Sequence, residues 1–180
     1  MIADTLLTGL RRANLACATL VGLALLACVG FILIDIVLRP FGLSFGGTDE
    51  ISGYTMAGAT SWGLSYALTA LAHVRIDLLR TRLDRPLRLA MDFLSLGLLA
   101  AVAIFVAWQG WGVLSSTLAN DARANTALAT PLWIPQLAWW SGWVWFAACA
   151  VVLWAAALAT VLTGHTDSAE AAIGARGEAT

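Results

Sequence analysis

The chain has 180 residues, of which 60% are hydrophobic and 12% are charged, and its net charge is −1. A water-soluble domain of this size needs more charged side chains to cover its surface, so this composition excludes an ordinary soluble enzyme or binding domain. The sequence has no basic tail or patch interleaved with aromatic residues, so we expect no nucleic-acid partner. The composition predicts an all-α integral membrane protein.

Four largely apolar stretches predict four transmembrane helices, at about residues 13–38, 50–72, 87–114 and 136–162. A helix of about 22 residues is about 33 Å long, which is enough for a hydrocarbon core of about 30 Å. The last uncharged stretch is too long for one span, so we expect its prolines to divide off a short interfacial piece before a helix that starts near Gln136. Residues 1–163 are therefore predicted to form one four-helix transmembrane domain, and the small polar residues 164–180 a flexible cytoplasmic tail.

The arginines predict the orientation of the chain in the membrane. All ten basic residues are arginine, and eight of them precede the first span, separate the second from the third, or follow the fourth. The positive-inside rule places these segments in the cytoplasm. Both termini and the segment 73–90 are therefore predicted to be cytoplasmic.

The first span ends in a predicted ion pair, because Arg39 follows Asp35 by one helical turn. Ionisable groups in the middle of a span usually mark ion or substrate routes, and the middle of each span here has none. The three cysteines, Cys17, Cys28 and Cys149, are scattered through the spans and do not have the spacing of metal ligands. We therefore predict no catalytic residue, no cofactor and no metal site.

The second span carries a ridge of small residues at every fourth position, namely Gly53, Ala57, Ser61, Ser65 and Thr69. Small residues at this spacing let a second helix approach closely, and their hydroxyl groups can bond across the contact. The ridge winds around the helix, so it cannot face one straight partner along its whole length. Packing against the first or third span and contact with another subunit both remain open.

Segment 74–90 predicts an amphipathic helix that lies in the membrane interface between the second and third spans. Its aliphatic residues recur at helical spacing and its arginines fall mostly on other sides, where they can reach lipid phosphates. A solvated arginine-rich loop is the alternative. Pro86 is expected to open the third span, with Asp84 or Arg85 as its cap. Seven tryptophans flank the connection between the third and fourth spans, as an aromatic belt or as contacts with another protein.

Residues 47–79 resemble the DctQ-like family, the small membrane subunit of TRAP (tripartite ATP-independent periplasmic) transporters. The resemblance rests on an acidic residue and a tyrosine that open the second span, a mid-span tryptophan and a His-x-Arg-x-Asp exit, which here are Glu50, Tyr54, Trp62, His73, Arg75 and Asp77. The segment that contains Pro131 and Pro135, before the fourth span, is also similar to the family. One departure is Ser141-Gly142, where the family often has Pro-Gly.

The resemblance implies a sodium-driven symport system for organic acids in a bacterial inner membrane. In that system a large membrane subunit carries the substrate and sodium sites, a periplasmic solute-binding protein captures the substrate, and the small subunit binds the large one as a static scaffold, giving a heterodimer. The six motif residues are then expected to contact a partner or to fix the fold. The alternative function is a non-catalytic four-helix membrane anchor for another complex, such as a redox enzyme.

Overall fold

The computed structural model describes residues 2–72, 83–126 and 128–164. These residues form four α-helices, α1 (Ile2–Leu38), α2 (Thr48–Thr69), α4 (Arg85–Ala119) and α5 (Trp133–Leu162), and the short 3-10 helix η1 (Arg39–Phe41). Over the described residues the fold is all-helical and contains no sheet, which confirms the predicted fold class at this level. The predicted interfacial helix falls largely on residues 73–82 and the predicted tail on residues 165–180, which lie outside the described residues.

Three of the described helical segments are long and apolar enough to cross a membrane, Thr5–Phe41, Arg85–Ala119 and Trp133–Leu162. Helix α2 is not among them, although the sequence predicted a span at about residues 50–72. Its composition explains the difference, because α2 contains many glycine, serine and threonine residues that lower its hydropathy.

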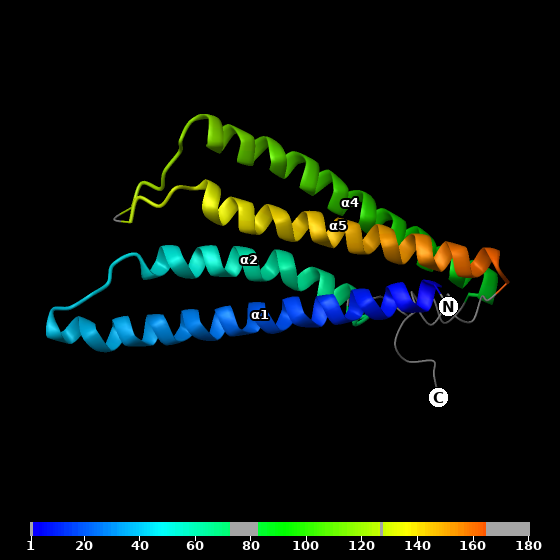
Figure 1. The fold of residues 1–180 in the computed structure, drawn as a ribbon, viewed down its shortest axis with the longest axis horizontal. Helices are drawn as coiled ribbons and strands as arrows, with labels where there is room; N and C mark the ends of the chain where they lie inside the picture. The colour runs from blue at the N-terminus through cyan, green and yellow to red at the C-terminus, as the bar shows by residue number, and fades with distance from the viewer. Residues whose placement is uncertain (1, 73–82, 127, 165–180) are drawn as a thin grey trace.

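The helices form two antiparallel hairpins, α1 with α2 and α4 with α5, and the hairpins meet where α2 lies against α5 (Figure 1). The main hydrophobic core lies around α5, where small residues such as Ala103 and Ala150 are fully buried beside Phe146. Small core residues let the helices approach closely, as is usual for membrane helices. Helix α1 packs on one side only, and the rest of its surface remains exposed.

The helix ends follow the proline positions. Pro86 lies in the first turn of α4, as the sequence predicted, and Asp84, one of the two predicted caps, occupies the N-cap position without a side-chain hydrogen bond to the helix. Helix α5 begins at Trp133, earlier than the predicted start near Gln136, and so includes Pro135 in its first turn. A proline is tolerated there because the first N–H groups of a helix have no partner within the helix.

Candidate functional site: inter-helix contacts and an apolar groove

Glu50 ties the start of α2 to the connection between α4 and α5. The Tyr54 hydroxyl donates a hydrogen bond to Glu50 Oε1 at 2.7 Å, and the Thr126 hydroxyl donates one to Glu50 Oε2. Tyr54 follows Glu50 by one turn, so both side chains lie on the same side of α2. An antiparallel bridge between Arg123 and Pro131 closes the connection into a narrow loop. The Glu50 carboxylate therefore holds the α4–α5 loop over the first turn of α2.

The same loop presses against Gly47, the residue that precedes α2. A Cβ atom at Gly47 would lie 2.6 Å from Cγ of Leu128, and the backbone φ angle of Gly47 is +68°. Glycine adopts this left-handed conformation without cost, whereas any other residue would be strained there and its Cβ would force the Leu128 side chain to move. The loop is thus seated directly on the first turn of α2.

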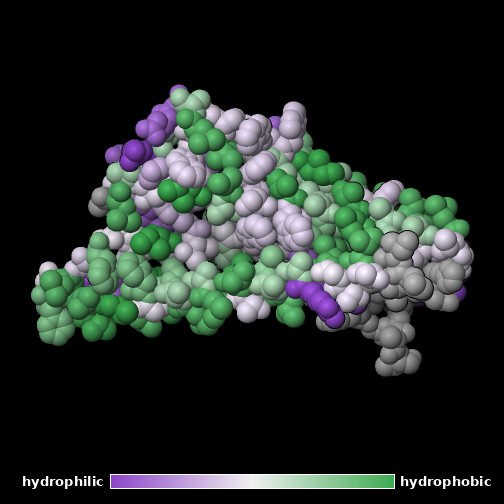
Figure 2. Space-filling view, viewed as in Figure 1, coloured by the Kyte–Doolittle hydropathy of each residue, from purple (hydrophilic) through white to green (hydrophobic). Residues whose placement is uncertain are grey.

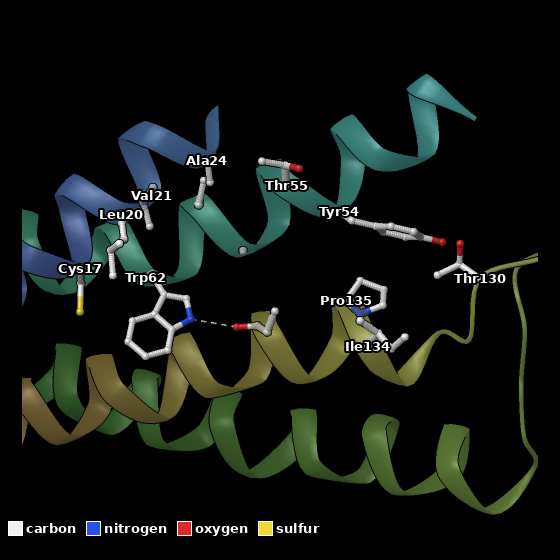
Figure 3. A pocket seen from close by; sticks show the side chains of 13 residues that line it. Cys17, Leu20, Val21, Ala24, Tyr54, Thr55, Trp62, Thr130, Ile134 and Pro135 are labelled. Carbon is white, nitrogen blue, oxygen red and sulfur yellow. Dashed lines mark hydrogen bonds between the residues drawn. The ribbon is translucent and has the colours of Figure 1, made fainter. Parts of the chain in front are cut away.

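Trp62 joins the middle of α2 to α5. Its indole Nε1 donates a hydrogen bond to the backbone oxygen of Ala138 at 3.0 Å (Figure 3). An indole N–H that packs against another helix usually finds such an acceptor.

An apolar groove of about 530 Å³ lies between α1, α2 and the beginning of α5. Tyr54 and Trp62 of the family motif line it, together with Pro135 and the α1 residues Cys17 to Ala24 (Figure 3). The polar atoms of both aromatic side chains are hydrogen-bonded to the protein. The surface of the groove is therefore mainly apolar, and it favours contact with apolar groups.

The small-residue ridge of α2 divides between two environments. Gly53 is exposed and Ala57 is half-buried, whereas Ser61, Ser65 and Thr69 are buried inside the bundle. The backbones of α2 and α5 approach closely at Gly142, where a Cβ atom would lie 2.7 Å from Cβ of Ser61 and 2.9 Å from its backbone carbonyl carbon. The buried part of the ridge packs against α1 and α5 of the same chain, which leaves its N-terminal end, at Gly53, exposed.

Asn14 is a functional candidate that the sequence analysis missed. It is fully buried, and its amide nitrogen donates to the backbone oxygen of Ser65 at 3.1 Å and to the hydroxyl of Thr69 at 3.2 Å. Its amide oxygen accepts a hydrogen bond from Trp145 Nε1 at 2.8 Å, and Cys149 lies 3.7 Å from the amide. One side chain thus connects α1, α2 and α5. The sequence did offer one indication of this role. Asn14 is an amide side chain within an apolar helix, and such a side chain must find hydrogen-bond partners inside the protein.

The predicted ion pair at the C-terminal end of α1 is confirmed. Arg39 Nη2 lies 2.8 Å from Asp35 Oδ2, and the carboxylate of Asp35 is fully buried. The Ser44 hydroxyl and the backbone N–H of Phe45 also donate to Asp35, at 2.9 and 2.8 Å. These bonds fold the segment after η1 back onto α1.

The exit motif of the second span, which comprises His73, Arg75 and Asp77, lies outside the described residues. Among the residues that the structure describes, no group of three or more histidine, cysteine, aspartate or glutamate side chains is placed to hold a metal ion. The described contacts of the other motif residues join helices and loops to one another.

The family model for the DctQ component of tripartite ATP-independent periplasmic transporters matches residues 28–160 of this chain. Comparison with curated proteins and with solved structures gave no match.

Proposed function

Because that family model matches most of its length, this chain belongs to the DctQ family of small, non-catalytic TRAP membrane components, and we propose that it is the static scaffold of a sodium-driven uptake transporter for organic acids. In this proposal it forms a heterodimer with the large membrane subunit, which carries the substrate and sodium sites. A periplasmic solute-binding protein delivers the substrate to this pair. The chain is a multi-pass membrane protein, and we place it in a bacterial inner membrane.

The observation that carries the proposal is that polar side chains join α1, α2, α5 and the α4–α5 loop to one another at three levels. Asn14 joins α1, α2 and α5, Trp62 joins α2 to α5, and Glu50 joins α2 to the loop between α4 and α5. Close-packed helices with satisfied polar contacts resist continuous deformation. A bundle built in this way moves as one body, which is what a scaffold beside a moving transport subunit requires.

We propose that α2 is the fourth transmembrane span, despite its low hydropathy. It lies between α1 and α5 and is about 33 Å long, at about 1.5 Å per residue. The hydroxyl groups of Thr55, Ser61 and Ser65 donate to carbonyl oxygens of their own helix. Hydroxyl groups that are satisfied in this way do not need water, so the helix can reside in a bilayer.

The proposed orientation, with both termini in the cytoplasm, predicts a labelling pattern. In a variant in which Cys17, Cys28 and Cys149 are replaced by alanine, Arg123→Cys should react with a membrane-impermeant maleimide in intact cells. Arg82→Cys should react only after the cells are permeabilised, because the positive-inside rule places it in the cytoplasm. The reverse pattern would contradict the orientation.

The motif residues then have two proposed roles. Glu50, Tyr54 and Trp62 fix the fold, and their hydrogen bonds to the α4–α5 loop and α5 support this role. For His73, Arg75 and Asp77 we propose contacts at the cytoplasmic interface with the large subunit or with lipid phosphates, where charge-assisted hydrogen bonds are strong.

Co-purification tests the proposed partner. An affinity tag on this chain should recover the untagged large TRAP membrane subunit from solubilised membranes in a ratio near one to one, measured by mass spectrometry. A tagged membrane protein of similar size from the same cells serves as the control. Recovery of a redox enzyme, or of this chain without the large subunit, would refute the proposal.

A further inference from the structure

Helix α1 projects beyond the rest of the bundle at its outer end. The hydrogen bonds of Asn14 place it level with Ser65 of α2 and Trp145 of α5. From that level α1 continues outward for about 36 Å, whereas α5 reaches its first residue after only about 18 Å, at about 1.5 Å per residue. Figure 1 shows the end of α1 extending past the beginnings of α2 and α5.

The projecting end of α1 lies outside the bilayer. Arg11 and Arg12 are exposed and precede Asn14 by less than one turn, so they mark the inner limit of the hydrocarbon. A hydrocarbon core of about 30 Å and a headgroup layer of about 7 Å together cover about 25 residues of a helix. The bilayer therefore ends near Val37, and a typical tilt of about 20° moves this limit by only about two residues. Phe41 and Leu43 lie farther out.

The surface of this end is nevertheless apolar. We call residues 39–43, which lie beyond this limit, the outer tip. Phe41 is 75% exposed and Leu43 59%, and Figure 2 shows the hydrophobic surface at this end of the molecule. Phe45 lies after the tip, where the chain has turned back, and its ring stacks on Phe31 of α1 with centroids 5.2 Å apart. An apolar patch of this kind in water marks a surface that another protein covers.

The polar groups around the outer tip are hydrogen-bonded to one another, although the Arg39 side chain remains 56% exposed. The buried carboxylate of Asp35 accepts hydrogen bonds from Arg39, Ser44 and the backbone of Phe45. Arg39 also donates to Thr48 at 3.4 Å, which fastens the tip to α2. The tip is therefore preorganised. A preorganised apolar surface is typical of permanent interfaces, whereas a soluble protein that docks and leaves depends more on complementary charges.

The apolar surface of the tip continues down α1 into the membrane. Leu26, Leu33 and Val37 follow one another at intervals of seven and four residues, so they lie on one side of the helix, opposite Asp35. Each of them is more than half exposed. Lipid cannot cover the tip, and a soluble protein cannot reach Leu26. Only a partner with a transmembrane part and an extramembrane part covers the whole stripe.

We propose that this stripe and the outer tip form one continuous interface with the large TRAP membrane subunit. This interface depends on the proposed function, because it involves the same partner. It adds the surface of this chain that the partner contacts. The large subunit would contact α1 with a transmembrane helix and the tip with an adjoining segment outside the bilayer.

Photo-cross-linking in native membranes tests the interface. A photoreactive phenylalanine analogue is placed at the position of Phe41 or of Leu26, and, as controls, at Leu98 and Leu118, which are exposed on α4. We expect both α1 positions to cross-link to the large subunit, at least fivefold above the α4 positions. Cross-links from Phe41 to the solute-binding protein or to a second copy of this chain, or none above the controls, would overturn the interface.

A substitution gives a second readout. Phe41→Glu should lower recovery of the large subunit at least threefold, whereas Leu118→Glu should leave it unchanged. Since the side chain of Phe41 is exposed, this variant should fold, and its elution as a single peak in detergent verifies that it does. Wild-type recovery by Phe41→Glu would overturn the interface alone. Failure of the unmodified chain to recover the large subunit would instead refute the proposed function, and the interface with it.

Discussion

Replacing Gly142 by alanine is expected to destabilise the bundle severely. The added methyl group would lie 2.7 Å from Cβ of Ser61 and 2.9 Å from its backbone carbonyl carbon, so α2 and α5 would have to separate. Overpacking of this kind costs typically about 1–3 kcal/mol, and a backbone neighbour leaves little room for relaxation. We expect a fall of at least several degrees in the thermal unfolding midpoint of the purified chain in detergent, with part of the protein lost as aggregate.

Two companion variants make this result specific. Gly112→Ala changes a glycine of α4 that has nothing within 4 Å of the added methyl group, so its midpoint should stay the same or rise, because alanine favours a helix. Ser61→Gly combined with Gly142→Ala should recover only part of the loss, because it removes the Ser61 side chain but leaves its backbone carbonyl carbon 2.9 Å from the new methyl group. A midpoint for Gly142→Ala equal to that of Gly112→Ala would show that α2 and α5 do not cross at this contact.

The features that sequence predicted well are those encoded by local patterns. The long apolar helices, the Asp35–Arg39 pair at one-turn spacing and the start of α4 at Pro86 all depend on neighbours within a few residues. The start of α5 was predicted too late, because a proline inside a helical sequence usually indicates a helix break. Pro135 lies in the first turn of α5, where proline is tolerated.

The features that sequence did not predict come from distant partners. The contacts of Asn14 lie 51 to 135 residues away, so no window along the chain contains them. Gly142 appeared in the sequence analysis only as the second residue of Ser141-Gly142, where the family often has Pro-Gly, and its role depends on Ser61 of another helix. Leu128 meets Gly47 because the α4–α5 loop folds over α2, which requires the arrangement of all four described helices.

The same limit applies to the outer tip. The apolar pattern of the sequence continues to the end of α1. It does not show that α1 extends farther than α2 and α5 at this end of the bundle. That relation follows from the level at which Asn14 joins the helices. The tip therefore becomes visible as a surface only once the bundle is assembled.

Uptake by reconstituted vesicles is the measurement that tests the scaffold role most directly. Vesicles with an inward sodium gradient would contain the large subunit with or without this chain, and the solute-binding protein would carry a radiolabelled organic acid that the intact system transports. We predict uptake only when this chain is present, and no heat of binding when the isolated chain is titrated with the same acid. Uptake at the full rate without this chain would contradict the account.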